Sequence, residues 1–142
     1  MNIGIDIGST ASKVVVYDKE KDEIAYKILM PSGWNSKETS VEIYKNLVEN
    51  GYDVDNSFVV ATGYGRVSVP YADRVVTEIT THSKGAIYLL QSDCDVIDIG
   101  GQDTKIINIS NGLVSDFIMN DKCSAGTGKF LEVMSNRLGV TL

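Results

Sequence analysis

Cysteine, histidine and long apolar runs are scarce in this sequence of 142 residues, and the shortages exclude several classes of protein. Two cysteines are too few for the disulfide framework of a small secreted domain, so we expect a reducing compartment. No apolar run approaches the roughly 20 residues that cross a bilayer. Met1 leads directly into a strand pattern instead of an apolar signal core. The sequence therefore predicts a cytoplasmic protein with no membrane partner.

Basic residues are also few, and they are scattered along the chain. The 13 Lys and Arg residues face 19 Asp and Glu residues, which leaves a net charge of −6. A surface that follows a phosphate backbone needs clustered Lys and Arg, so we expect no nucleic-acid partner. Apolar residues, by contrast, make up 43% of the chain, enough for the core of one ordinary domain.

Alternating apolar residues and turn signals predict a repeated order of strands and helices. The chain reads as a three-stranded meander, a helix, a buried strand, a short strand and a second helix, followed by another meander and a final helix. The expected strands are 2–7, 12–17, 23–29, 57–61, 74–77, 95–99, 105–110 and 113–119, and the expected helices are 36–50, 80–91 and 126–138. This order predicts an α/β fold.

An internal repeat is the most informative feature of the sequence. Residues 6–13 read Asp-Ile-Gly-Ser-Thr-Ala-Ser-Lys, and residues 98–105 read Asp-Ile-Gly-Gly-Gln-Asp-Thr-Lys. Asp, Ile, Gly and Lys recur at matching positions, and each copy follows a strand and opens a hairpin. Two copies of one supersecondary unit predict the starts of two related lobes.

The residue types in both copies suit the phosphates and the cation of a nucleotide. Glycine at the turn lets backbone N–H groups approach an anion, hydroxyls add donors, and lysine supplies a positive charge. An aspartate at the strand end can hold a hydrated divalent cation. One copy alone would be weak evidence because Asp-Gly turns are common in hairpins. Two copies that face each other would clamp a triphosphate and its magnesium.

Four segments, taken in order, resemble the activators of 2-hydroxyacyl-CoA dehydratases and the related ATPase subunits of benzoyl-CoA reductases. These families belong to the actin, hexokinase and heat-shock chaperone ATPase superfamily. The segments are residues 6–13, 61–66, 98–105 and 120–130. The resemblance implies a ribonuclease H-like (actin-like ATPase) lobe, βββαβα, at residues 1–91. It also implies the incomplete first half of a second lobe of the same type at residues 92–142, within a truncated chain.

The same resemblance implies ATP binding and hydrolysis with Mg²⁺. Asp6 and Asp98 would hold the magnesium through water, and Glu78 or Gln102, together with Asp98, would serve catalysis by orienting the attacking water. The residues expected to bind ATP or ADP are Asp6, Gly8, Ser9, Thr10, Ser12, Lys13, Asp98, Gly100, Gly101, Gln102, Thr104, Lys105, Gly126, Thr127, Gly128 and Lys129.

Cys123 has two interpretations. It precedes Gly126, where helix N–H groups and the helix dipole would favour the thiolate that binds iron. An isolated cysteine is, however, more often a small residue packed at a helix cap. The resemblance favours the ligand, because it implies a 4Fe-4S cluster shared across a homodimer with two cysteines from each subunit, of which Cys123 matches the first. Cys94 matches no cluster position and is expected to be a core thiol.

The function implied by the resemblance is an ATPase coupled to electron transfer. ATP hydrolysis would drive one electron from the cluster into a 2-hydroxyacyl-CoA dehydratase or related reductase, with a ferredoxin- or flavodoxin-type protein as electron donor. Two alternatives stay open: a sugar or carboxylate kinase, in which Cys123 would be incidental, and a fragment with no catalysis of its own. His82, four residues after Glu78 on one helical face, could form a metal pair, but such pairs are more often only hydrogen-bonded.

Overall fold

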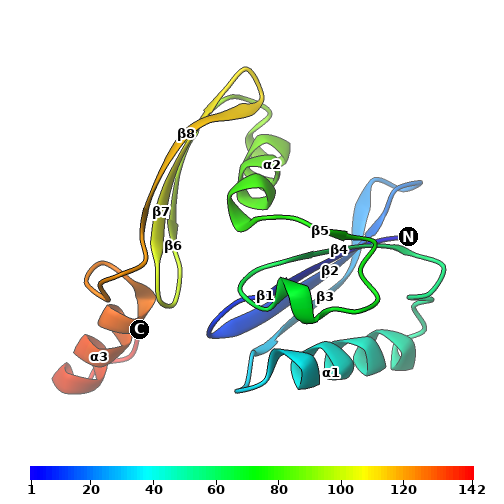
Figure 1. The fold of residues 1–142 in the computed structure, drawn as a ribbon, viewed down its shortest axis with the longest axis horizontal. Coiled ribbons are helices and arrows are strands. Elements are labelled where there is room, and N and C mark those ends of the chain that lie inside the picture. Colours follow the sequence, from blue (N-terminus) through cyan, green and yellow to red (C-terminus); the bar gives the residue numbers. More distant parts are fainter. The chain divides into compact units, whose positions relative to one another are not determined.

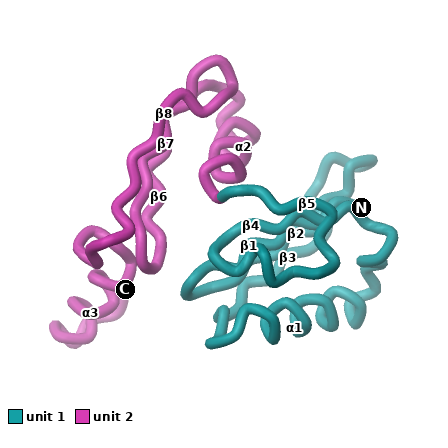
Figure 2. Tube along the Cα trace, in the orientation of Figure 1, with its two compact units in different colours: residues 1–77 teal, residues 78–142 magenta.

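The computed structural model describes residues 1–142, and the chain forms two compact units, Met1–Thr77 and Glu78–Leu142 (Figure 2). The predicted α/β fold is confirmed, with each unit built on its own sheet. The units divide before helix α2 (Glu78–Leu90), which packs on the strands of the second unit. From the sequence, the boundary between the two ATPase lobes is expected after residue 91. Compact units and family lobes are different divisions of the chain, so that boundary stays a prediction.

The first unit is a five-stranded sheet covered by a helix. Its strand order is β3-β2-β1-β4-β5. The elements are β1 (Asn2–Ile7), β2 (Ala11–Asp18), β3 (Glu23–Pro31), α1 (Ser36–Glu49), β4 (Phe58–Thr62), a short 3₁₀ turn η1 (Arg66–Ser68) and β5 (Arg74–Val75). All the strands and helices expected in this part of the sequence are present, and their bounds differ by a few residues at most.

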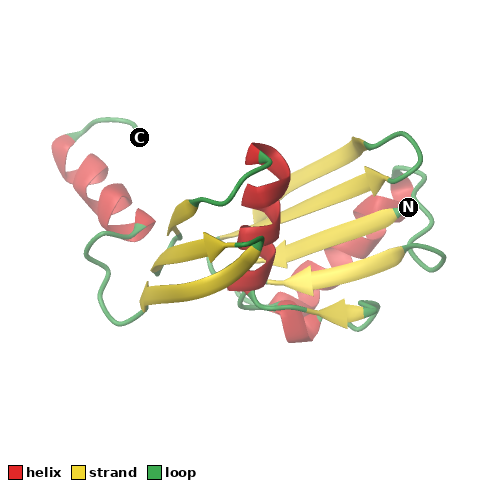
Figure 3. Ribbon diagram, turned by 90° about the horizontal axis from the view of Figure 1, so that it is seen from above, coloured by secondary structure: helices red, strands yellow, loops and turns green.

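The core of the first unit lies between this sheet and α1, which runs along one face of the sheet (Figures 1 and 3). Strands β1 and β2 alternate between buried and more exposed residues, so that Ile3, Ile5 and Val14 all point into the core. Ile43 and Leu47, four residues apart on one side of α1, are fully buried against them. The apolar residues that alternate along the strands therefore pack against the apolar side of the helix in one layer.

The strand directions gather three loops at one end of this sheet. Strand β1 is antiparallel to β2, β2 is antiparallel to β3, and β1 is parallel to β4. The carboxyl ends of β1, β3 and β4 therefore share an edge. The β1–β2 turn (residues 8–10), the segment 32–35 and the loop 63–65 all follow strands at this edge.

The second unit is an antiparallel sheet, β6 (Asp95–Ile99), β7 (Thr104–Ser110) and β8 (Leu113–Asn120), with α2 packed beside it (Figure 1). Asn111 and Gly112 both have positive φ and form the predicted hairpin turn between β7 and β8. Helix α3 (Gly128–Leu138) begins two residues later than expected and ends at Gly139 in the left-handed conformation. None of the three helices combines the length and apolar character that crossing a bilayer requires.

Replacing Ile43 by Ala tests the core of the first unit. The fully buried side chain leaves a cavity, and we expect the free energy of unfolding to fall by about 2–5 kcal/mol. Val41→Ala on the same helix is the matched control, because the Val41 side chain is half exposed and the change should cost less than about 0.5 kcal/mol. Urea titrations followed by circular dichroism measure both. Equal losses for the two variants would contradict the observed orientation of α1.

Candidate functional site

The turn between β1 and β2 carries the first copy of the repeat. Ser9 and Thr10 are exposed at its tip. A Cβ atom on Gly8 would lie 2.8 Å from the Ala11 carbonyl oxygen, so the tight turn has no room for a side chain there. Lys13 Nζ lies 3.1 Å from Asp6 Oδ2, and 52% of the Lys13 side chain is exposed. The first turn therefore presents hydroxyls and an accessible ammonium group at one end of the sheet.

Two glycines that the sequence analysis left without a role support this turn from behind. Gly63 has φ +86°, and a Cβ atom there would lie 2.3 Å from Asp6 Oδ1 and 2.5 Å from the Ile7 carbonyl oxygen. The Gly65 N–H donates to that same carbonyl at 2.8 Å. The loop 63–65 is thus bonded to the end of β1, and Gly63 leaves the space that the Asp6 carboxylate occupies. The repeated glycines around Tyr64 were the available signal.

Ser12 was expected to bind the nucleotide, but its side chain is fully buried. Its hydroxyl lies 2.8 Å from the Ser32 hydroxyl, and the Ser32 N–H donates to the Thr10 carbonyl at 3.1 Å. Ser12 and Ser32 therefore tie the segment after β3 to the turn. A fully buried hydroxyl with a partner has no access to a phosphate, so we assign Ser12 to support.

The turn between β6 and β7 carries the second copy of the repeat. The Gly100 N–H donates to the Asp103 carbonyl at 2.8 Å, and a Cβ atom on Gly100 would lie 2.3 Å from Asp103 Oδ1. A side chain at this position would have to displace the Asp103 carboxylate, while the nearest backbone atom, the Asp103 carbonyl oxygen, lies 3.2 Å away. Gln102 is exposed at the tip, and Gly101 is half buried.

The segment before α3 supports the second turn. The N–H groups of Gly128 and Lys129 donate to the carbonyls of Gly100 and Gly101 at 2.8 and 3.0 Å. The Thr104 hydroxyl donates to the Gly126 carbonyl at 2.6 Å.

The side chains beside these backbone groups are also engaged. Thr127 is fully buried and its hydroxyl donates to the Ser124 carbonyl, while Lys129 Nζ pairs with Glu132. These groups were predicted to bind the nucleotide. The N–H groups of Gly128 and Lys129 and the hydroxyls of Thr104 and Thr127 are used within the unit, so in this structure they support the turn. Gly126 contributes its carbonyl as an acceptor, and the Lys129 side chain is more than half exposed, so nucleotide binding by these two residues stays a prediction.

Lys105 lies at the centre of a group of carboxylates. Its Nζ is 2.9 Å from Glu78 Oε2, 2.9 Å from Asp103 Oδ2 and 3.5 Å from Asp98 Oδ2, and only 3% of the side chain is exposed. Burial is the largest influence and by itself lowers the pKa of the ammonium group. The hydrogen bonds and charges of Asp103 and Glu78 together outweigh it, so the pKa of Lys105 is raised above the usual range of lysine.

His82 joins the same group through Asp98. Its Nδ1 lies 3.0 Å from Asp98 Oδ2, so the histidine pairs with the strand aspartate. The hydrogen bond from His82 is the largest influence on the Asp98 carboxyl and lowers its pKa. Partial burial opposes this shift, and the charges of His82 and Lys105 reinforce it. No three His, Cys, Asp or Glu side chains of the chain are placed to hold a metal ion among themselves.

Both cysteines are free thiols. Cys123 is exposed in the loop between β8 and α3, where the Asn120 side-chain amide donates to its carbonyl at 3.1 Å. The first N–H groups of α3 donate to the second turn, so they do not point at the thiol as the sequence suggested. Cys94 is half buried just before β6, and its carbonyl accepts a bond from the Ile109 N–H.

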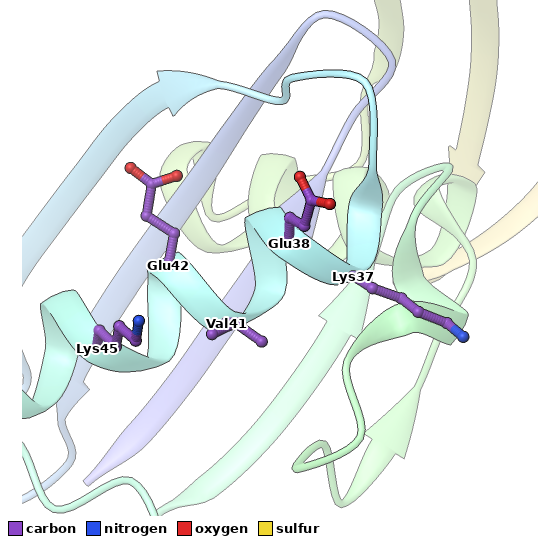
Figure 4. Close-up of a pocket in the computed structure, with 5 residues that line it drawn as sticks. All are labelled: Lys37, Glu38, Val41, Glu42 and Lys45. Carbon is purple, nitrogen blue, oxygen red and sulfur yellow. The ribbon is translucent and has the colours of Figure 1, made fainter.

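The first unit also has a surface depression on α1. Its lining consists of Lys37, Glu38, Val41, Glu42 and Lys45, all from the outer side of α1 (Figure 4). Glu38 and Glu42 point to the same side of the helix. Five side chains of one helix do not enclose a ligand, so we assign no function to this depression.

Comparison with known proteins places this geometry in context. Residues 3–142 match the model of the BadF/BadG/BcrA/BcrD ATPase family. The chain is 44% identical to the (R)-2-hydroxyglutaryl-CoA dehydratase activating ATPase of Acidaminococcus fermentans, over 97% of this chain and 54% of that protein. The chain thus spans about half the length of the relatives it matches.

Two solved structures are similar over almost the whole chain. Component A of the Acidaminococcus fermentans (R)-2-hydroxyglutaryl-CoA dehydratase has 42% identity and a TM-score of 0.87, covering 99% of this chain and 54% of the other. The activator of the Clostridium difficile 2-hydroxyisocaproyl-CoA dehydratase with bound ADPNP has 38% identity and a TM-score of 0.86, covering 99% of this chain and 53% of the other.

Gly63→Ala tests whether the loop 63–65 holds Asp6. Gly51→Ala is the matched control, because Gly51 has φ +84° and no atom within 4 Å of its Cβ position, whereas Gly63 has φ +86° and meets Asp6 and Ile7. Left-handed strain should cost each variant about 1–2 kcal/mol. We expect Gly63→Ala to lose clearly more in urea unfolding, and to weaken Mg-ATP binding where Gly51→Ala does not. Matching losses in both assays would refute the support role.

Stability at high pH tests the Lys105 group. An unfolded lysine loses its proton near pH 10.4, whereas folded Lys105 keeps it to higher pH. Above the unfolded pKa the folded state binds more protons than the unfolded state, so stability falls as pH rises. Urea unfolding between pH 7 and 11.5 should show this decline in the wild type. Lys105→Met should be less stable at pH 7, and its free energy of unfolding should fall less steeply as pH rises. If the stability of the two proteins fell in parallel with pH, Lys105 would not be held by the three carboxylates.

Proposed function

The chain belongs to the BadF/BadG/BcrA/BcrD ATPase family, and from this premise we propose that it binds and hydrolyses ATP with Mg²⁺ as part of an activator. The partner is a 2-hydroxyacyl-CoA dehydratase or an enzyme of the benzoyl-CoA reductase type. Four sequence motifs led to the same family, and two relatives with solved structures are described as a dehydratase component and a dehydratase activator.

The observation that carries the nucleotide part of the proposal is the pair of tight glycine turns, one in each unit, that end in accessible polar groups. In the first turn, Gly8 keeps the backbone open while Ser9, Thr10 and Lys13 provide donors for phosphate oxygens. In the second turn, the Gly100 N–H already donates to the Asp103 carbonyl, which leaves half-buried Gly101 and exposed Gln102 as the candidates for phosphate contact. The ADPNP bound to the Clostridium difficile activator supports a nucleotide as the ligand.

The aspartates at the starts of both copies are the candidates that bind the cation. Asp6 and Asp98 are each the last residue but one of a strand and would hold Mg²⁺ through water, since each accepts a bond from a lysine and retains further oxygen lone pairs. Glu78 and Gln102 are the candidates that orient the attacking water. Mg²⁺, when bound, supplies charge neutralisation for the phosphates.

Cys123 carries the electron-transfer part of the proposal. Its exposed thiol lies in the loop that leads into α3, and the N-terminus of α3 is hydrogen-bonded to the second turn. A turn that responds to ATP hydrolysis is thus linked by two backbone hydrogen bonds to the segment that bears the thiol. We propose that Cys123 ligates a 4Fe-4S cluster shared across a homodimer, since a two-fold axis brings the same residue of two subunits together. The cluster, when bound, supplies one electron to the partner enzyme after reduction by a ferredoxin- or flavodoxin-type donor.

Iron analysis of the full-length protein, reconstituted without oxygen, tests this function. We expect about four irons per dimer, lost in Cys123→Ala and retained in the matched variant Cys94→Ala. ATP hydrolysis should survive both changes, because neither cysteine takes part in the turns. Iron that is absent, or held equally well without Cys123, would refute the activator and favour a phosphoryl-transferring kinase.

A further inference from the structure

The two lysines of the repeat occupy equivalent positions but have different surroundings. Each points back to the aspartate seven residues earlier, Lys13 to Asp6 at 3.1 Å and Lys105 to Asp98 at 3.5 Å. Lys13 has this one carboxylate partner and is 52% exposed, whereas Lys105 has three carboxylate partners and is 3% exposed. A shared sequence position therefore does not imply a shared role.

The ammonium group of Lys105 has no donor left for a phosphate. An ammonium has three N–H bonds, and three carboxylates lie within 3.5 Å of Nζ. Moving Nζ toward a nucleotide would leave Glu78 and Asp103 without their counter-charge in a partly buried site, which is strongly unfavourable. Lys13 is half exposed and has a single carboxylate partner, so moving its ammonium group toward a phosphate would not leave a buried charge unpaired.

The three carboxylates come from three different parts of the second unit. Glu78 is the first residue of α2, Asp98 lies on β6, and Asp103 lies in the turn that carries Gly100 and Gln102. The Lys105 ammonium therefore fixes the start of α2 to the turn. Glu78 in particular is held by one of the two shortest contacts in the group, at 2.9 Å.

We propose that Lys105 is a positioning residue: it orients Glu78 for the attacking water and holds the second turn, while Lys13 alone is the phosphate-binding lysine of the repeat. This inference rests on the proposed ATPase function. It replaces the direct contact between Lys105 and phosphate that the sequence motif suggested.

A comparison of the two equivalent variants separates these roles. In the full-length protein, Lys13→Met should raise the Kd for Mg-ATP on the order of tenfold, because a charge-assisted contact to phosphate is lost. Lys105→Met should leave that Kd within about threefold but lower kcat about 100-fold. The double variant Glu78→Gln, Lys105→Met should be no slower than the slower single variant, since both changes remove one function. Lys105→Met that raises Kd like Lys13→Met at unchanged kcat would overturn the proposal.

A second measurement does not depend on activity or on the folding of a variant. In the wild-type chain at neutral pH, the ¹⁵Nζ–H signal of Lys105 should be visible because its protons exchange slowly, and that of Lys13 should be broadened by exchange. Adding Mg-ADP should make the Lys13 signal visible, because contact with a phosphate slows its exchange, and leave that of Lys105 in place. A fast-exchanging Lys105, or a Lys105 signal that shifts when Mg-ADP is added, would overturn the proposal.

If Lys105→Met unfolds, the variant that also carries Glu78→Gln and Asp103→Asn removes the uncompensated charges, and its Mg-ATP Kd should match that of Glu78→Gln, Asp103→Asn alone. A higher Kd would count against the proposal. If the wild type hydrolyses no ATP, the proposed function fails, while the NMR comparison still decides whether Lys105 is held by carboxylates.

Discussion

A buried ammonium group must keep carboxylate partners, and in the second unit this requirement determines where Glu78, Asp98 and Asp103 lie. Lys105 is almost fully buried on β7, and its three partners come from a helix, a strand and a turn. Neither α2 nor the β6–β7 turn can move far without separating a charge pair. The candidate water-orienting residue and one candidate phosphate turn are therefore parts of a single electrostatic group.

The two turns reach similar geometry by different means. In the first unit, the loop 63–65 meets the end of β1 through a bond from Gly65 to Ile7, and Gly63 leaves room for Asp6. In the second unit, the first N–H groups of α3 bind the turn carbonyls. In both, a turn that is open to solvent on one side is held from the other side by backbone hydrogen bonds from a distant segment. Such support lets exposed glycine turns keep one shape, which a phosphate site needs.

Much of the fold could be predicted from the sequence, because strand alternation, the Asn111-Gly112 turn and the repeat are local signals. Individual roles at the site were harder to predict. The motif identifies Lys105 with Lys13, yet burial and the arrival of Glu78 from α2 depend on tertiary packing that no local pattern encodes. Ser12 was expected to face a ligand, but the period-2 alternation of β2 places it on the buried side, next to Ser32. The family resemblance implies that Gly128 binds the nucleotide, and only the structure shows that its N–H donates to the Gly100 carbonyl.

We assign different roles to the two matching lysines, phosphate binding to Lys13 and positioning to Lys105. A crystal structure of the full-length protein with Mg²⁺ and ADPNP tests this assignment most directly. We predict that Lys13 Nζ contacts a phosphate oxygen, while Lys105 Nζ keeps its contacts with Glu78 and Asp103. A structure in which Lys105 Nζ leaves these carboxylates and binds a phosphate would contradict the account.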